Sequence, residues 1–397
     1  PTLVVFQAGV SASDTHLERL VAEAQNAATL DLLLTAAQTN AFHSAILVTE
    51  DPTLATSASN LPLSNLPLHI QPATEYAIRN TQYALTPFHF GQNLLRICQE
   101  HRLERVVYVG GGAMPLATPH ALADLVLSVS GAGESVISNN LFSADLVAFY
   151  PASALERIDM PASDNDLAWL LHYRAGLPHA ATVKSLATHF DLDTPTDLAT
   201  LRHSTLSAPL DRALSPHMAA FLKRVPLELP ALEANVERAY KVMATRRAQV
   251  FLAGRVSSWT WRRMEINLPC QTRILSEERG MRASGRESSG AARSLLGLYT
   301  DLAGISGLIS ALEATSDAAF LDTRVLFAHM GLKPARPDRF ASDALLPSEI
   351  ADPWLRELTE AASNASIPIV LGGHSLIAGG MWALSEQVRG SASSAAS

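Results

Sequence analysis

Short apolar runs alternate with helix-like segments through the first half of the chain, and this alternation is the feature that most restricts its fold. The runs Leu3–Phe6, Ser44–Thr49 and Arg105–Val109 have the length and apolar character of buried strands. Between them, His16–Gln38 is rich in Ala and Leu, and Gly91–His101 is also expected to be helical. Strands that alternate with helices favour an α/β fold, with a mostly parallel sheet flanked by helices on both faces.

The same pattern continues beyond these elements. Further strands are expected at Leu68–Ile70, Ser135–Asn139 and Leu146–Tyr150, and further helices at Pro119–Ser128 and Ala168–Ala175. The stretch from Leu54 to Pro72 is rich in Ser, Asn and Pro, so we expect a loop around the short strand there.

The alternation lapses between His203 and Pro216, where Ser, Pro, Leu and Asp predominate. We place a domain boundary there, with a first domain at residues 1–205 and a second, mainly helical domain of unassigned role at 206–390. The expected elements of the second domain are helices at Glu233–Arg247, Ala291–Glu313, Ser316–Met330 and Met381–Val388, and one strand-like run at Pro368–Leu371. Residues 391–397 are small and polar, and we expect a disordered tail or an artificial extension.

Composition excludes several classes of protein. Of the 397 residues, 48% are hydrophobic, which is ample for buried cores, and the net charge of −8 disfavours a general nucleic-acid binder. The two cysteines, Cys98 and Cys270, lie too far apart in sequence for a disulfide framework or a four-cysteine zinc site. No apolar run reaches the roughly 18–20 residues that a membrane span needs, and the first residues lack the basic region of a signal peptide. We therefore expect a cytoplasmic protein without a membrane partner.

Three places combine strand ends with small or acidic residues. The first strand runs into Gln7-Ala8-Gly9-Val10-Ser11, and the strand at Val106–Val109 runs into Gly110-Gly111-Gly112. The third place is Phe190-Asp191-Leu192-Asp193-Thr194-Pro195, read as a strand that ends in a capped helix, with Asp191 and Asp193 on one face of the extended stretch. Ligands of such sheets bind at the carboxyl ends of strands, where glycine turns allow a close approach to phosphate.

The order of these motifs resembles the GT-A-type nucleotidyltransferases, especially the molybdenum-cofactor and 2-phospholactate guanylyltransferase branch. That family carries a late Asp-x-Asp-Thr-Pro-Glu-Asp-Leu, which Phe190–Leu198 matches closely, and a central Gly-Asp-x-Pro-Leu followed by Thr-Pro. The central element is matched by Met114-Pro115-Leu116 and Thr118-Pro119. The resemblance covers residues 1–205, about half of the chain.

The resemblance implies transfer of a nucleoside monophosphate from a nucleoside triphosphate to a small phosphorylated or carboxylated acceptor, with Mg²⁺ as cofactor. The residues it implies for nucleotide binding are Ala8, Gly9, Ser11, Gly110, Gly111 and Gly112. Asp191 and Asp193 are the candidate catalytic carboxylates, and Asp193 and Asp145 the candidate metal ligands. The second domain is a candidate for self-association.

Two departures from the family pattern keep an alternative open. Ala113 stands where the family has its metal-binding aspartate, and the first turn lacks the Arg and Lys that neutralise a triphosphate. The chain is thus either a transferase with a rearranged site, or a protein of this fold that has lost transfer and binds a nucleotide, a sugar nucleotide or a partner as a scaffold.

The second half supplies further polar candidates. Arg273, Arg279 and Glu277 lie in a dense polar stretch, and His374 follows a glycine pair between a strand and a helix. Arginines suit phosphates and carboxylates, so these four residues are the candidate acceptor-binding set. Alternatively, the polar stretch is a solvated helix face, or the chain is a different enzyme whose site lies in this half. The segment Asp322-Thr323-Arg324 is expected to form a structural buried ion pair.

Overall fold

The computed structural model describes residues 1–72, 88–131, 133–206, 215–224 and 228–396. These residues form two compact units, each with its own sheet. The first unit comprises residues 1–12, 22–189 and 215–218, and the second comprises the described residues within 13–21, 190–214 and 219–397. The main division falls at His189, ahead of the boundary expected near 205. Part of that expected boundary, residues 207–214, lies outside the described residues.

The first unit is built on a seven-stranded sheet with the order β3-β2-β1-β4-β6-β5-β7. Strand β6 is antiparallel to both of its neighbours, and the other pairs are parallel. The strands are β1 (Thr2–Phe6), β2 (Ser44–Val48), β3 (Leu68–Gln71), β4 (Val106–Gly110), β5 (Ser135–Ser138), β6 (Leu146–Tyr150) and β7 (His179–Ala181). The expected mostly parallel sheet is confirmed, and β7, only three residues long, is the strand that the apolar pattern misses.

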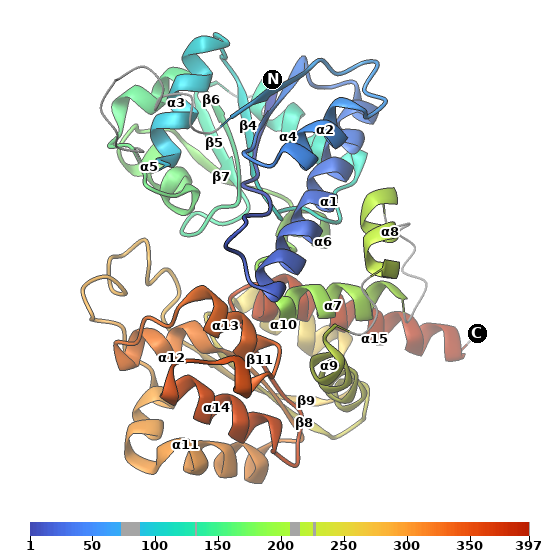
Figure 1. The fold of residues 1–397 in the computed structure, drawn as a ribbon, viewed down its shortest axis with the longest axis vertical. Helices are drawn as coiled ribbons and strands as arrows, with labels where there is room; N and C mark the ends of the chain where they lie inside the picture. Colours follow the sequence, from blue (N-terminus) through green and yellow to red (C-terminus); the bar gives the residue numbers. More distant parts are fainter. Residues whose placement is uncertain (73–87, 132, 207–214, 225–227, 397) are drawn as a thin grey trace. The chain divides into compact units, whose positions relative to one another are not determined.

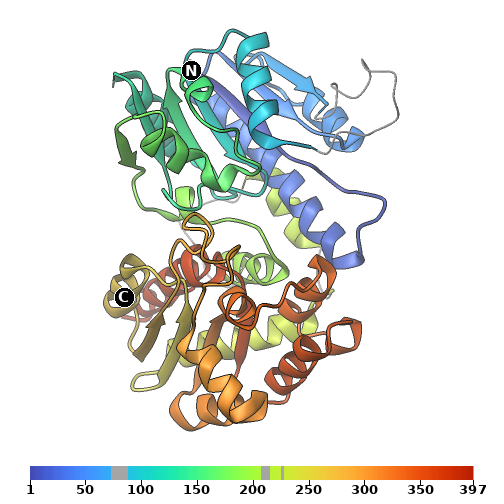
Figure 2. The ribbon, with the colours of Figure 1, turned by 90° about the vertical axis from the view of Figure 1, so that its left-hand side faces the viewer.

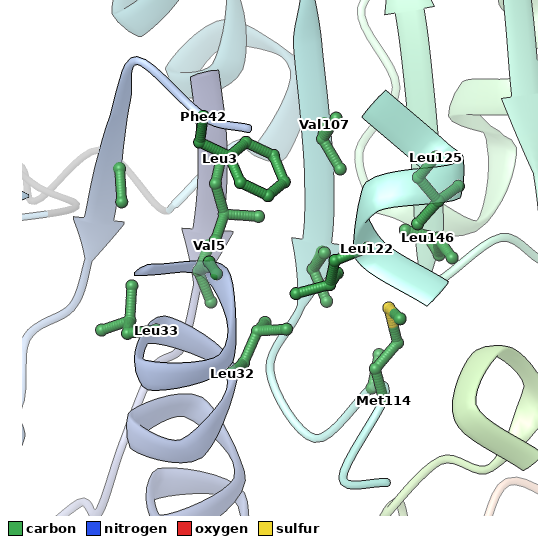
Figure 3. Packing of buried hydrophobic residues seen from close by; sticks show 14 of the residues in the cluster. Leu3, Val5, Leu32, Leu33, Phe42, Val107, Met114, Leu122, Leu125 and Leu146 are labelled. Atoms are coloured by element: carbon green, nitrogen blue, oxygen red, sulfur yellow. The ribbon is translucent and has the colours of Figure 1, made fainter. Parts of the chain in front are cut away.

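Helices cover both faces of this sheet because each central strand buries both of its sides. In β1, Leu3 and Val5 enter one core and Val4 and Phe6 the other. The first core is completed by α1 (His16–Thr39), α2 (Pro52–Ser59) and α4 (Pro119–Gly131), and Figure 3 shows part of its packing. The second core is completed by α3 (Phe90–Glu100) and α5 (Leu167–Tyr173) on the opposite face (Figure 1). Short helices occupy Ala152–Arg157, Asp164–Asp166 and α6 (Leu186–His189).

The second unit also has a parallel sheet, of four strands in the order β11-β10-β8-β9. Its strands are β8 (Gln249–Gly254), β9 (Gln271–Ser276), β10 (Ala318–Asp322) and β11 (Ile369–Gly372). Helices α7 (Pro195–Leu206), α9 (Pro230–Met243), α10 (Ser258–Asn267) and α15 (Met381–Ala396) pack together, as do α11 (Leu295–Thr315), α12 (Thr323–Met330), α13 (Arg336–Asp343) and α14 (Pro353–Ser363) (Figures 1 and 2). Helix α8 spans Pro216–Arg224 and a short helix Pro347–Glu349. The mainly helical character of this half is confirmed, but of its strands the sequence predicts only β11.

Several expected elements differ in the structure. The predicted helix Ser316–Met330 is wrong at its start, because Ala318–Asp322 is the buried central strand β10 and the helix begins at Thr323. A short apolar run has no periodicity that separates a buried strand from a helix. The strand expected to lead into the helix at Thr194-Pro195 is wrong: His189 ends α6, and Asp191 makes only an isolated bridge. The expected loop from Leu54 begins within α2.

Two further differences concern the second half. The polar stretch from Arg273 is not a helix: it consists of the end of β9 and the turns that follow it. Helix α15 runs to Ala396, where the sequence analysis predicts a disordered tail. Alanine has the highest helix propensity, so an existing helix extends readily through such residues.

Helix α11 is, among the described residues, long and apolar enough to cross a membrane by length and composition. A third of its most apolar window is buried, and the helix is kinked at Gly304. This is weak evidence for a membrane span, because helices that pack on a sheet pass the same test.

A buried ion pair links the ends of the two middle strands of the second unit. The Nε and Nη2 atoms of Arg255 donate to Asp322 at 2.6 and 3.1 Å. Burial pushes the pKa of Asp322 upward, but Arg255 more than offsets this and holds the pKa below its ordinary value. Asp322 is therefore an ionised carboxylate whose charge depends on its partner. The ion pair expected between Asp322 and Arg324 is wrong in its partners: both side chains are in buried ion pairs, but Asp322 pairs with Arg255 and Arg324 with Asp343.

We predict that Asp322→Asn destabilises the second unit by about 3–5 kcal/mol, because it leaves the Arg255 cation buried and unpaired. The matched control is Asp301→Asn, since Asp301 pairs with His329 through a half-exposed carboxylate and should change stability by less than about 1 kcal/mol. Urea denaturation of the full chain, followed by tryptophan fluorescence, measures both. Equal effects of the two variants would contradict the argument.

A second prediction concerns acid stability of the first unit. Burial, assisted by the nearby His172, lowers the pKa of His179, whose Nε2 lies 2.9 Å from the hydroxyl of buried Ser138. Below the ordinary pKa of about 6.5 the unfolded chain binds the proton more readily than the folded one, so this group lowers stability as pH falls through that value. We expect His179→Gln to lose less stability than the parent between pH 7.5 and 5.5 in urea titrations. The same loss in both proteins would refute it.

Candidate functional site

Two glycine turns stand side by side at one edge of the first sheet. Strands β1 and β4 are parallel neighbours, with Phe6 paired to Gly110 at their carboxyl ends. The residues that follow, Gln7 to Ser11 and Gly111 to Gly112, therefore leave the sheet at the same edge. This is the edge at which parallel sheets of this kind receive ligands.

The first turn is fixed by a network of side chains around Asp51. Gly9 has a positive φ of 79°, and a Cβ atom there would lie 2.2 Å from the Cβ of Asp51. Asp51 accepts hydrogen bonds from Val10 N at 3.2 Å and from Asn26 Nδ2 at 2.8 Å, and it also caps α2. Burial pushes its pKa upward, but these hydrogen bonds outweigh burial and hold the pKa below its ordinary value. An ionised Asp51 therefore anchors the turn.

Gln7 connects this network to the second turn. Its Nε2 donates to Asn26 Oδ1 at 3.0 Å. A Cβ atom on Gly111 would lie only 1.6 Å from Gln7 Oε1 and 3.0 Å from the carbonyl oxygen of Phe6. Only glycine allows the second turn to pack this closely on the first. Gln7 and Asn26 thus hold the two turns, which we call the glycine-turn site, in one arrangement.

All six predicted nucleotide-binding residues lie in these two turns. In the first, Ala8 and Ser11 are exposed and Gly9 is half-buried; in the second, Gly110 and Gly112 are buried and Gly111 is half-buried. The structure brings them together, while their contact with a nucleotide remains a prediction. Ala113, at the position of the family's metal-binding aspartate, packs in the hydrophobic core.

The carboxylate of Asp164 and the backbone carbonyl of Asp145 lie beside the second turn. The Gly110 amide donates to the backbone carbonyl of Asp145 at 2.8 Å, and the hydroxyl of Tyr108 donates to Asp164 Oδ2 at 2.8 Å. That Asp164 oxygen lies 3.0 Å from where a Cβ on Gly110 would stand. Asp145 is a sequence-predicted residue, whereas Asp164 was missed because only the tertiary structure brings it to this turn.

The residues at this turn could supply only some of the ligands of a Mg²⁺ ion, with water and substrate phosphates supplying the others. No three His, Cys, Asp or Glu side chains are grouped to hold a metal anywhere in the described ranges. Magnesium in proteins is commonly held by one or two carboxylates together with water and substrate phosphates. Asp145 and Asp164 match that chemistry.

The predicted catalytic residues Asp191 and Asp193 belong to the second unit, whereas the glycine turns belong to the first. Asp193 is exposed, and its amide donates to Asp197 Oδ2 at 3.1 Å at the start of α7. The carbonyl of Asp191 accepts from the Ser375 hydroxyl at 3.2 Å. These contacts show a capped helix entry, as the Thr-Pro sequence suggests. The second predicted metal ligand, Asp193, is thus in a different unit from Asp145.

The four predicted acceptor-binding residues make separate contacts in the second unit. Glu277 accepts hydrogen bonds from the Ser294 hydroxyl at 2.7 Å and from Leu295 N at 2.6 Å, so its carboxylate holds the start of α11. Arg273 is exposed on the edge strand β9, and Arg279 is exposed in the turns after it. His374 follows β11 and is close enough to affect Asp322 electrostatically. Glu277 and His374 follow the carboxyl ends of β9 and β11, which are the two edge strands of this sheet.

Sequence reasoning missed Gln7, Asn26, Asp51 and Asp164. For Asp51 a signal existed, because Asp followed by Pro marks a helix start. Asn26 lies within an ordinary helix and has no local signal.

Solved structures are similar to part of the chain. A cytidylyltransferase from Leptospira borgpetersenii has 11% identity and a TM-score of 0.36, with 57% of this chain and 93% of the other covered. A protein assigned as a nucleotide-diphospho-sugar transferase from Desulfovibrio desulfuricans has 16% identity and a TM-score of 0.35, covering 59% and 96%. A CMP:2-keto-3-deoxy-manno-octonic acid synthetase complexed with CTP has 13% identity and a TM-score of 0.32, covering 52% and 98%.

No protein-family model matches the chain, and neither does any curated protein. The strand order and pairing confirm the predicted α/β fold with a mostly parallel sheet in the first unit. These similarities do not carry an activity to this chain.

We predict that Gly9→Ala destabilises the first unit by roughly 2–4 kcal/mol, because the new Cβ meets Asp51 and the backbone has a positive φ. The matched control is Gly131→Ala at the end of α4, where a Cβ would meet nothing within 4 Å. It should change stability by no more than about 1 kcal/mol. Urea denaturation checks both, and a neutral Gly9→Ala would disprove the anchoring role of Asp51.

Proposed function

We propose that the glycine-turn site binds a nucleoside triphosphate and that the protein transfers a nucleoside monophosphate from it to a small phosphorylated or carboxylated acceptor. The observation that carries the proposal is the close packing of Gly111 on Gln7, which joins two glycine turns at the carboxyl ends of adjacent parallel strands. Backbone without side chains at this edge lets a ligand approach the amides.

The chemistry is an in-line displacement at phosphorus. An acceptor oxygen forms a bond to the α-phosphorus, the bond from that phosphorus to the bridging oxygen of the β-phosphate breaks, and pyrophosphate leaves with the electron pair. A phosphate or carboxylate acceptor is already ionised at neutral pH, so the attacking oxygen needs no general base. The main task of the protein is positioning, which a rigid pair of turns provides.

Mg²⁺, when bound with the triphosphate, would neutralise charge on the phosphates. Asp164, whose carboxylate lies beside Gly110, and Asp145, whose backbone accepts from the Gly110 amide, are the residues that would hold it. Asp51 is committed to anchoring the first turn, and the predicted catalytic roles of Asp191 and Asp193 remain proposals. We further propose a cytoplasmic protein without nucleic-acid or membrane partners that self-associates through its second half.

One observation favours a second candidate function. Ala113 is buried in the core where a metal-binding aspartate would be expected, so the site has one carboxylate fewer. A protein with this site that binds a nucleotide or sugar nucleotide without transferring it is the alternative.

The test is a thermal-shift series with the four nucleoside triphosphates, with and without Mg²⁺. A triphosphate at about 100 times its Kd should add about 2.7 kcal/mol of stability, and we expect Mg²⁺ to increase the effect. Pyrophosphate release is then measured with a panel of phosphorylated and carboxylated acceptors. Binding with release supports transfer, binding without release supports the alternative, and no nucleotide response contradicts both.

A matched pair of variants locates the binding. Ala8→Glu places a negative charge on the exposed first turn and should weaken triphosphate binding by charge repulsion. Ser130→Glu adds the same charge at an exposed position of α4 and should leave binding unchanged. If both variants bind as the parent does, the triphosphate does not bind at the glycine-turn site.

A further inference from the structure

The second unit has its own ligand-binding edge, set by the order of its strands. From β8 the chain moves to β9 on one side and then returns past β8 to β10 and β11 on the other. The point where the strand order reverses lies between β8 and β10. In open parallel sheets, ligands bind outside the carboxyl ends of the strands at such a switch point.

The carboxyl ends of these strands carry charged and glycine residues. Arg255 follows β8, Asp322 and Arg324 stand at the end of β10, and the Gly372-Gly373-His374 turn follows β11. The hydroxyl of Thr323 donates to the Gly372 carbonyl at 3.2 Å, which ties β10 to this turn. The charged and glycine residues of the second unit therefore lie at the carboxyl edge of its sheet, where the strand order predicts ligand binding.

Arg324 extends from β10 toward the turn after β11. Its two terminal nitrogens donate to Asp343 at 3.1 and 2.7 Å. Its Nε lies 3.8 Å from where a Cβ on Gly373 would stand, so no side chain separates it from that backbone. The bidentate pairing with Asp343 fixes the guanidinium in place and leaves its Nε side toward the glycine turn.

Arg339 on α13 adds a third cation, one helical turn before Asp343. Its Nε is buried and has no hydrogen-bond partner among the described residues. Burial lowers the pKa of Arg339 and the Arg324 cation lowers it further, whereas the Asp343 carboxylate acts in the opposite direction; Arg336 and Arg282 lower the pKa by smaller amounts. A buried donor that lacks an acceptor is costly, so such a group points to a ligand that supplies one.

Most of the arginines at this edge are in ion pairs. Arg255 is paired with Asp322 and Arg324 with Asp343, so each of those pairs is neutral. Arg336 lies 3.9 Å from Glu18, and Arg282 lies 3.7 Å from Glu287. Among the described residues Arg339 is in no ion pair: Asp343, the carboxylate that acts on its charge, is already paired with Arg324, on which the buried Asp197 also acts.

We propose that the carboxyl edge of the second unit's sheet binds the phosphate group of a small molecule, or free phosphate, through Arg339, Arg324 and the backbone of the Gly372-Gly373 turn. This site is separate from the glycine-turn site and does not depend on the function proposed for it. A phosphate oxygen accepts from Arg339 Nε, and two guanidinium groups together match a dianion better than a single carboxylate. His374, half-buried beside Asp322, stands at the same turn and is a further contact for the ligand.

The experiment titrates the full chain with sodium phosphate at constant ionic strength, followed by calorimetry and thermal shift. Saturable binding is expected, and Arg339→Gln should weaken it by about 10- to 100-fold, as the loss of a charged hydrogen bond does. Arg246→Gln is the matched control, because Arg246 is exposed in the turn before β8, at the opposite end of that strand. It should bind phosphate as the parent does. An absence of saturable phosphate binding, or equal binding by Arg339→Gln and the parent, overturns the proposal.

Two additions keep the outcome clear. Arg339→Lys retains the charge and should bind phosphate with an affinity between those of the parent and Arg339→Gln. If Arg339 were purely structural, the three phosphate affinities would not follow this order. In the parent, the Nε–H signal of Arg339, identified by its absence in Arg339→Lys, should shift in NMR spectra as phosphate is added; an unmoved signal refutes the site even if Arg339→Gln does not fold.

Further measurements show whether the ligand is free phosphate or a phosphorylated small molecule, and distinguish this site from the glycine-turn site. Glycerol 3-phosphate should compete with phosphate, and tighter binding of it would indicate a phosphorylated small molecule, while tighter binding of phosphate would indicate the free ion. Acetate should not compete; its competition on equal terms would mean that the site takes carboxylates and would overturn the phosphate assignment. Ala8→Glu should leave phosphate binding intact, so a failed nucleotide response leaves this test unaffected.

Discussion

In each unit the strands are buried on both faces and mostly pair in parallel, and this determines where polar and charged side chains can lie. In a strand such as β1, successive side chains from Leu3 to Phe6 pack into one or the other of two hydrophobic cores. An unpaired charge within such a strand would therefore be buried in apolar surroundings. Polar groups can gather only where the strands end, and parallel strands end together. The glycine turns of the first unit and the arginines of the second are both placed by this constraint.

The two edges are stabilised differently. In the first unit Gln7, Asn26 and Asp51 form a chain of hydrogen bonds, and glycine is required at positions 9 and 111 because neighbouring atoms fill the space of a Cβ. In the second unit, the bidentate pairs Arg255–Asp322 and Arg324–Asp343 bring buried charges to the strand ends. The first edge has glycine turns supported by neutral amides and one carboxylate, and it suits backbone contact with a ligand. The second presents fixed cations.

Sequence reasoning recovers much of the first unit and less of the second. The apolar runs of β1, β2 and β4 are bounded by clear turns, and the glycine turns after β1 and β4 are visible as motifs. In the second unit, β10 merges with α12 in one apolar stretch, so the strand that carries Asp322 is read as helix. As a result Asp322 and Arg324 are expected to pair with each other, whereas their actual partners are Arg255 and Asp343, which no local pattern indicates.

By itself the sequence determined the α/β class, the mostly parallel sheet and the six small residues of the two turns, because these depend on local composition and on the period of apolar residues. Only the tertiary structure decided that Gln7 joins the turns, that Asp164 stands beside Gly110, that Asp191 and Asp193 belong to the second unit, and that Arg339 lies near Arg324. Those facts depend on which distant segments become neighbours when strands pair, and no periodicity in a single chain records that choice.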